Sequence, residues 1–194
     1  MYSLFLTVII IKSSYMNKIS KWLLIIQLVF LLLHSGHANA DGFIDEISFG
    51  VGEEKNDDID IYRLGLKKDF GRQFLANPSG WLSGYFEGSI NYWHHTADDI
   101  YAAALSPVFV YYFGTETSSV LPYIEAGIGV CVISDTEIGG VDMTTAFQFE
   151  DRIGAGIRTE KLDFNFRYMH YSNGSISQPN EGVDILIGTL SYRF

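Results

Sequence analysis

The chain has little that could cross-link it or hold a metal through sulfur. Cys131 is the only cysteine among 194 residues, which excludes an internal disulfide and any site built from several cysteines. Basic residues are also scarce, because 13 Lys and Arg face 23 Asp and Glu, for a formal net charge of −10. This balance argues against a nucleic-acid partner, which would need a basic face.

Charged residues of both signs are few, and apolar ones are abundant. Charged residues make up 19% of the chain, below the roughly 25% of ordinary soluble domains, whereas 47% of the residues are hydrophobic and 15% are aromatic. So many large apolar rings exclude a disordered chain, because their burial can offset the entropy of ordering. Mean hydropathy is +0.12, and the question is where this apolar surface goes.

Part of it lies in an N-terminal targeting segment. An apolar stretch over 22–33 follows the basic Lys18 and Lys21 and ends near Ala38-Asn39-Ala40, a small-x-small cleavage site. This pattern predicts a secretory signal peptide over residues 1–40, with Met16 as an alternative start. The alternative is an uncleaved membrane anchor. Residues 41–194 then carry 10 basic and 23 acidic residues, and no apolar run of 18 or more.

The remainder alternates between apolar and polar residues, as strands do. In one segment the even positions from Leu82 to Tyr92 are apolar or Gly, and the odd ones from Ser83 to Asn91 are mostly polar. Eight such segments are predicted, separated by turns rich in Gly, Asp, Asn and Ser. They begin near Ile44, Ile59, Trp81, Ala102, Leu121, Thr144, Leu162 and Val183.

Two architectures bury strands of this kind, a soluble sandwich and a membrane barrel. The segments are about as long as a tilted membrane-spanning strand requires. Their polar faces carry acids and arginines that could pair inside a narrow barrel, and aromatic residues gather near strand ends as an interfacial girdle would. We therefore predict an all-β, eight-stranded antiparallel transmembrane barrel of the outer-membrane type over 41–194, without a pore. The polar-face residues are Arg63, Glu87, Glu125, Arg152, Asp163 and Arg167, and the girdle residues are Tyr92, Trp93, Tyr111, Tyr112, Tyr168 and Tyr192.

With both termini in the periplasm, four acidic loops face outward. They span 52–58, 94–99, 134–142 and 173–182, whereas many basic residues fall at the periplasmic end. A solvated set of loops is the simplest interpretation. If the loops instead met an anionic lipopolysaccharide surface, the like charges would repel unless divalent cations bridged the loops and the surface.

Three polar residues are predicted on the lipid-facing side, near the outer rim. His170 and Ser172 are two apart on one strand, so they share the face of Phe164 and Phe166, and Asp184 shares the face of Leu186 on the next strand. Polar groups at lipid are costly without a purpose. A nucleophile, a base and an acid in this order suggest a serine esterase, in which Asn173 and the loop N–H groups of Gly174 or Ser175 hold the oxyanion.

The segment His170-Tyr171-Ser172-Asn173-Gly174, with Gln178-Pro179-Asn180-Glu181-Gly182-Val183-Asp184, resembles the C-terminal signature of the lipid A 3-O-deacylase (PagL-like) family. The resemblance implies an eight-stranded outer-membrane barrel that removes the 3-O-linked hydroxyacyl chain from lipid A. It implies Ser172 as nucleophile, His170 as base, Asp184 as acid and Asn173 at the oxyanion hole. The family acid is typically Glu, so the shorter Asp184 puts the acid's role in doubt.

A rival acid is Asp151. If Glu160-Lys161 is a two-residue hairpin turn, Thr159 pairs with Leu162 and Asp151 lies opposite His170. We hypothesise that Asp151 supports or replaces Asp184, and a bulge that turns Asp151 inward is the alternative. Glu181 ranks behind Asp184, because it lies in the loop and off the lipid-facing parity.

The other candidates carry less chemistry. His94 and His95 alternate faces at an outer loop, so a metal site is not expected there, and no cofactor is predicted. Cys131 fits a small buried thiol. Two alternative functions stay open: a non-catalytic surface-binding or adhesin barrel, and an outer-membrane phospholipase. The expected partners are lipid A of lipopolysaccharide and outer-membrane lipid, and the oligomeric state, a homodimer included, is left open.

Overall fold

The computed structural model describes residues 42–54 and 58–194. The predicted signal peptide, its cleavage after Ala40 and the alternative start at Met16 lie outside these residues. No helix in the described part of the chain is long and apolar enough to cross a membrane. The strands are β1 Glu46–Glu54, β2 Ile59–Asp69, β3 Leu75–Asn77, β4 Gly80–His94, β5 Asp99–Phe113, β6 Leu121–Ile133, β7 Glu137–Ile138, β8 Val141–Asp142, β9 Phe147–Arg158, β10 Leu162–Ser172 and β11 Val183–Arg193.

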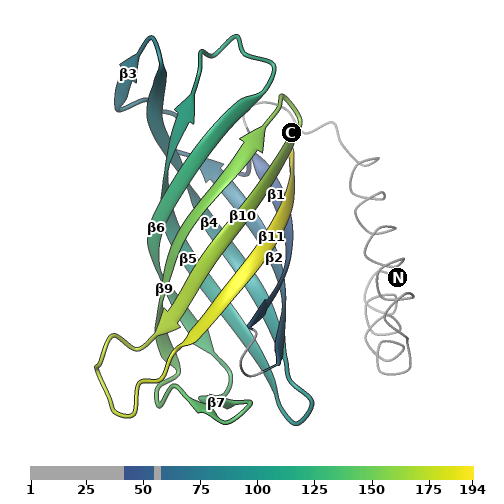
Figure 1. Ribbon diagram of the computed structural model, residues 1–194, viewed down its shortest axis with the longest axis vertical. Helices are drawn as coiled ribbons and strands as arrows, with labels where there is room; N and C mark the ends of the chain where they lie inside the picture. Colours follow the sequence, from purple (N-terminus) through teal and green to yellow (C-terminus); the bar gives the residue numbers. More distant parts are fainter. Residues whose placement is uncertain (1–41, 55–57) are drawn as a thin grey trace, which may run out of the picture. The chain divides into compact units, whose positions relative to one another are not determined.

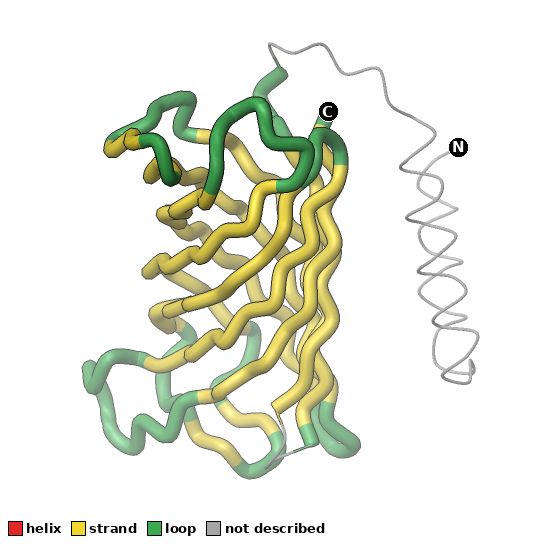
Figure 2. The backbone as a smooth tube through the Cα atoms, turned by 45° about the horizontal axis from the view of Figure 1, so that its top comes forward, coloured by secondary structure: helices red, strands yellow, loops and turns green. Residues whose placement is uncertain are grey.

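Eight of these strands form a closed antiparallel barrel (Figures 1 and 2). Each long strand pairs with its neighbours in the chain, β1 pairs with β11, and β2 pairs with β4 to complete the ring. The short β3 lies beside the start of β4, and β7 and β8 form a separate small hairpin. The predicted eight-stranded antiparallel barrel is thus confirmed, while these three short strands were not foreseen.

The barrel has two different ends. The start of β1 and the end of β11 lie together at the end drawn uppermost in Figure 1, here called the terminal end. The opposite end, here called the loop end, carries the segments 95–98, 134–146 and 173–182. The last two are the longest connections at that end among the described residues, and the hairpin β7–β8 lies within 134–146.

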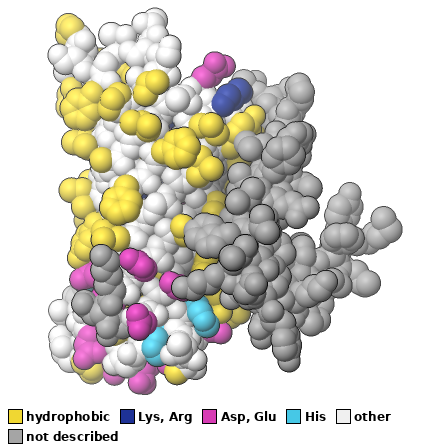
Figure 3. Space-filling view, turned by 45° about the vertical axis from the view of Figure 1, so that its right-hand side comes forward, with side chains coloured by type: hydrophobic (Ala, Val, Ile, Leu, Met, Phe, Trp, Pro, Cys, Tyr) yellow, Lys and Arg dark blue, Asp and Glu magenta, His cyan; other side chains and the backbone are white. Residues whose placement is uncertain are grey.

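The outer wall is apolar. Side chains such as Phe86, Ile90, Phe164 and Phe166 point outward and are half or more exposed, as the alternation predicted. Figure 3 shows hydrophobic side chains spread over the wall and acidic and histidine side chains gathered at the loop end. Apolar residues outside and charged residues inside are the pattern of a membrane barrel, not of a soluble one.

The middle of the interior is filled by ion pairs. Glu87 bonds Arg63 at 2.7 Å and Arg152 at 3.1 Å, and Arg167 lies 2.6 Å from Glu125. All five are fully or almost fully buried. The predicted pairing of acids and arginines inside a narrow barrel is therefore observed, and closely paired charges offset part of each other's desolvation cost.

Two further layers close the interior on either side of the ion pairs. At the loop end an apolar cluster includes Trp93, Met169 and Tyr171, together with Ile138 and Met143 from the segment 134–146. At the terminal end Tyr85, Tyr112 and Tyr123 pack together. Cys131 is buried and free, as expected.

Two residues assigned to the aromatic girdle point inward instead. Trp93 and Tyr112 are buried in the interior layers, whereas their neighbours Tyr92 and Tyr111 keep the outward direction. The reason is the pleat, because successive side chains on a strand point to opposite faces. Lys67 and Arg158 also lie inside the barrel, where both pair with Glu46.

Candidate active site

The end of β10 places a base and a nucleophile on its outward face. Met169 and Tyr171 point into the barrel and are 1% exposed, so His170 and Ser172 take the outward parity. His170 is about one-third exposed, while Ser172 is only 9% exposed. In the described residues no hydrogen bond joins the Ser172 hydroxyl to His170, which is common for such pairs before substrate binds.

Asp184 meets the imidazole from the next strand. The register pairs His170 with Asp184 across β10 and β11, and His170 Nδ1 lies 2.6 Å from Asp184 Oδ1. Tyr168, two residues before His170 on the same face, also interacts with this carboxylate. A carboxylate at Nδ1 favours the tautomer with its proton there, which leaves the Nε2 lone pair as a base.

Asp151 lies on the other side of His170. The turn at Glu160-Lys161 has the predicted register, with the Thr159 N–H donating to the Leu162 carbonyl, and it places Asp151 opposite His170. Pairing continues through Asp151, which is partly exposed on the outer wall, so the inward bulge is absent. Among the described residues, however, Asp184 alone bonds the imidazole, and Asp151 makes no hydrogen bond with it.

The chain turns sharply after the serine. Gly174 and Ser175 have φ of 63° and 65°, and the Ile176 N–H donates to the Asn173 carbonyl at 3.2 Å. These features define a type I′ turn, in which the amides of the two central residues are left out of the turn's own hydrogen bond. The two amides nearest to Ser172 in this turn are therefore the backbone donors of Gly174 and Ser175, where the sequence placed an oxyanion hole.

Asn173 itself is committed to the loop. Its side-chain Nδ2 donates to the carbonyls of Met143 at 3.0 Å and Ser177 at 3.2 Å, and its backbone N–H donates to Asn180 Oδ1 at 2.9 Å. The residue is completely buried. In this conformation Asn173 holds the segment 173–182 in place, and it has no donor left for an oxyanion.

The segment 173–182 rests on the segment 134–146. Besides the bond from Asn173 to Met143, the Asp142 N–H donates to Glu181 Oε2 at 2.7 Å. Met143 is buried in the apolar cluster, which links both loops to the barrel interior. Glu181 therefore fastens two loops together. Sequence reasoning missed this role, because no local pattern relates segments forty residues apart.

Gly182 makes room for the imidazole. It has a φ of +72°, and a Cβ added there would lie 2.9 Å from His170 Cε1. A side chain at this position would be strained by the backbone angle and would also press on the ring. The backbone angle and the close ring together favour glycine at this position.

An apolar groove begins at the site. It has a volume of about 660 Å³ and crosses the outer wall from His170 and Asp151 toward the middle of the barrel. Its lining includes Ala126, with a single methyl group, Gly127, which has no side chain, and Phe109. The position of the groove on the apolar wall suits an aliphatic chain.

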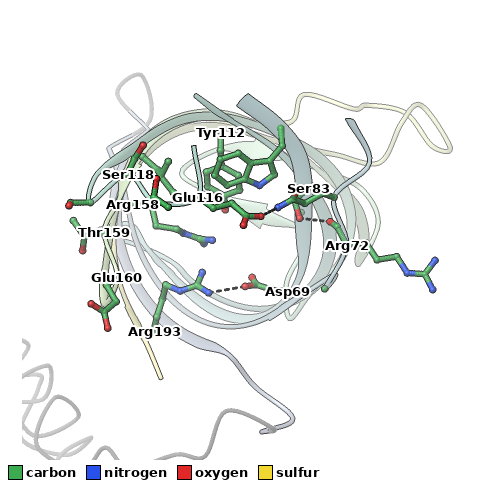
Figure 4. A pocket seen from close by; sticks show the side chains of 17 residues that line it. Asp69, Arg72, Ser83, Tyr112, Glu116, Ser118, Arg158, Thr159, Glu160 and Arg193 are labelled. Atoms are coloured by element: carbon green, nitrogen blue, oxygen red, sulfur yellow. Dashed lines mark hydrogen bonds and ion pairs between the residues drawn. The ribbon is translucent and has the colours of Figure 1, made fainter. Parts of the chain in front are cut away.

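A second pocket of about 660 Å³ lies at the terminal end (Figure 4). Arg193 bonds Asp69 at 3.0 Å across it, and Arg158 bonds Asp163 at 3.0 Å at its wall. Neither His170 nor Ser172 lines this pocket. It lies at the end of the barrel opposite to His170 and Ser172, so it does not form part of the site.

A similar histidine arrangement occurs on β4. His94 Nδ1 lies 2.7 Å from Asp99 Oδ1, the Tyr92 hydroxyl donates to the same oxygen at 2.8 Å, and Asp60 lies across the other strand boundary. Thr96 stands where Ser172 stands relative to His170. Only the β10 copy is followed by a type I′ turn. In the described part of the chain no cluster of His, Cys, Asp and Glu could hold a metal ion.

Comparisons with known proteins point to one family. The family described as lipid A 3-O-deacylase (PagL) matches residues 60–193. The lipid A deacylase PagL of Pseudomonas aeruginosa is 37% identical over 142 residues, covering 72% of this chain and 80% of that one. The Bordetella bronchiseptica protein of the same name is 35% identical over 127 residues, covering 65% and 66%.

Solved structures agree. The crystal structure of the outer membrane enzyme PagL superposes with a TM-score of 0.72 at 33% identity, covering 77% of this chain and 99% of that one. The strand count, the closed antiparallel barrel and the apolar outer wall are therefore those of an outer-membrane protein.

Proposed function

The chain belongs to the lipid A 3-O-deacylase (PagL) family, and we propose that it is an outer-membrane esterase that removes the 3-O-linked hydroxyacyl chain from lipid A. The observation that carries the proposal is the bond from His170 Nδ1 to Asp184, with Ser172 on the same outward face. The family membership supplies the substrate and the acyl position, and the residues supply the chemistry.

The proposed reaction is serine acyl transfer to water. Ser172 Oγ attacks the ester carbonyl while His170 Nε2 takes its proton, and Asp184 stabilises the imidazolium that forms. The tetrahedral intermediate collapses when His170 protonates the sugar oxygen, which leaves as the free hydroxyl. A water molecule, deprotonated by His170, then attacks the acyl-enzyme, releases the fatty acid and restores Ser172.

The turn after the serine supports stabilisation of the developing oxyanion. The Asn173 N–H is bonded to Asn180, so the N–H groups of Gly174 and Ser175 are the next backbone donors after Ser172, and fixed backbone donors need little reorganisation during the reaction. Asn173 contributes by holding this turn. For its own amide to act as a donor, one of its loop bonds would have to open.

The location of the site suits a substrate that stays in the bilayer. The groove that starts at His170 can take an acyl chain from the surrounding lipid, and the polar rim at the loop end can meet the sugar headgroup. We place the loop end at the outer leaflet. The ester would then lie at the boundary between chain and headgroup, beside Ser172.

The test is the lipid A of Gram-negative cells that express the chain, analysed by mass spectrometry. Wild-type protein should remove one hydroxyacyl chain, and Ser172→Ala and His170→Ala should remove none. His94→Ala is the matched control, because it removes an imidazole with the same aspartate partner geometry but no adjacent turn. Full activity of Ser172→Ala would overturn the proposal, as would unchanged lipid A with new lysophospholipid.

A further inference from the structure

The residue between the proposed base and nucleophile points the opposite way. Tyr171 lies in the barrel interior at 1% exposure, while His170 and Ser172 lie on the outer face. Neighbouring residues on a strand are tied to each other through the pleat. The position of the Tyr171 side chain therefore sets the position of both outward residues at once.

Interior residues contact the Tyr171 side chain at both its hydroxyl and its ring. Its hydroxyl donates to Glu150 Oε2 at 2.8 Å and accepts from Arg63 Nη1 at 3.1 Å. Its ring stands edge-on to Trp93, with centroids 4.7 Å apart and an interplanar angle of 64°. Trp93 is completely buried, as is Glu150. Both the polar tip and the apolar body of the side chain are thus held.

The partners of Tyr171 are bonded in turn to other strands of the barrel. Arg63 bonds Glu150 directly at 2.7 Å, and Ser106 donates to Glu150 at 2.6 Å. These residues lie on β2, β9 and β5, so Tyr171 is fixed to strands around the ring and not only to its neighbours. These contacts hold the end of β10, where the chain leaves the sheet for the segment 173–182.

We propose that Tyr171 is a positioning residue for the reaction, which anchors the end of β10 so that His170 and Ser172 keep their mutual geometry. This inference rests on the proposed function, because it needs those two residues to react. A displacement of about 1 Å in such a pair can cost up to about 10²-fold in rate. Tyr171 touches neither substrate nor reacting atoms and acts through its neighbours.

The barrel contains a matched control in Tyr85. Its hydroxyl donates to Glu125 Oε2 at 2.8 Å and accepts from Arg167 Nη2 at 3.1 Å, the same two bonds at the same distances. Tyr85 is equally buried, at 2%, but it belongs to the interior cluster at the terminal end. Tyr85→Phe and Tyr171→Phe therefore remove the same chemistry from two places.

The experiment measures kcat, KM and folded yield of both variants on purified lipid A, with the rate at which a fluorophosphonate probe labels Ser172. We expect Tyr171→Phe to lower kcat and the labelling rate about tenfold with KM nearly unchanged. Tyr85→Phe should keep both within about twofold, while the two unfolding midpoints fall equally. Trp93→Phe, which loosens the ring contact only, should act in the same direction as Tyr171→Phe.

Equal kinetics of the two tyrosine variants would overturn the positioning role, as would a fall in kcat that tracks the loss of folded protein. If Tyr171→Phe does not fold, Trp93→Phe carries the same test with its kinetics normalised to folded enzyme. Failure of the proposed function is distinguishable, because Ser172→Ala would then stay active whatever Tyr171 does.

Discussion

His170 Nδ1 and Asp184 Oδ1 lie 2.6 Å apart and come from residues paired across β10 and β11. The short side chain of Asp184, where the resemblance led us to expect Glu, therefore does not prevent contact with the imidazole. The aspartate reaches the ring because the register places it directly opposite, where the Cβ atoms of paired residues are about 5 Å apart.

This contact predicts different results for the two aspartates beside His170. Asp184→Asn should lower kcat by up to about 10⁴-fold, because an amide can stabilise the wrong tautomer and cannot stabilise the imidazolium. Asp151→Asn should stay close to wild type, because Asp151 lies opposite His170 without bonding it. Steady-state kinetics on lipid A in detergent decide the matter, and a large loss in Asp151→Asn would make Asp151 the acid.

Gly182 should tolerate no side chain. Gly182→Ala places a Cβ at 2.9 Å from His170 Cε1 on a backbone with φ of +72°, so the imidazole must shift from its position beside Asp184. We expect kcat to fall about tenfold or more. Gly188→Ala, on β11 six residues after Gly182, is the control, since its Cβ would meet nothing within 4 Å. Comparable losses in the two variants would contradict a specific effect on His170.

The interior ion pairs should govern stability. Glu87→Gln removes one of the two buried carboxylates that pair with Arg63 and Arg152, so that both cations depend on Glu150 alone, and it should lower the free energy of unfolding by about 3–5 kcal/mol. Urea unfolding in lipid vesicles, followed by tryptophan fluorescence, measures the change. Glu160→Gln, at an exposed turn, is the control and should change little. A loss below about 1 kcal/mol for Glu87→Gln would contradict this prediction, because it would show that removing the carboxylate leaves no uncompensated buried charge.

The groove should select the acyl chain. Ala126→Leu narrows its floor and should raise KM about fivefold or more for long acyl chains while leaving short ones less affected. Ala155→Leu adds the same volume to the outer wall at a residue that does not line the groove, and it should leave chain preference unchanged. The measurement is a series of lipid A substrates that differ in the length of the 3-O-acyl chain. Equal effects of the two variants on chain preference would show that the groove does not bind the acyl chain.

The barrel could be predicted from the sequence because its pattern is local. Alternation in segments such as 82–92 fixes which side chains face out, and the starts predicted at Ile59, Leu121, Leu162 and Val183 coincide with β2, β6, β10 and β11. The hairpin at Glu160-Lys161 also sets the register of β9 and β10. The starts predicted at Ala102 and Thr144 differ from those of β5 and β9, because β5 already begins at the turn residue Asp99 and β9 begins only at Phe147.

The candidate site was predicted only in part. The outward parity of His170 and Asp184 follows from alternation, and so does their neighbourhood once the hairpin is assumed. The commitment of Asn173 to Met143 does not, because it joins loops that are distant in sequence. The inward direction of Trp93 does follow from alternation, because it comes directly after the outward Tyr92, and the prediction of an aromatic girdle at the strand ends overlooked it.

The sequence by itself determined the barrel, through a strand period of two, an apolar outer face and charged residues that must pair inside. These features depend on neighbours along the chain or one hairpin away. The tertiary structure decided which carboxylate bonds His170, which donors remain free after Ser172, and that Tyr171 is held by Glu150 and Arg63. Closing the ring brings β2, β5 and β9 to the same interior, and that closure is a property of the whole barrel rather than of any segment.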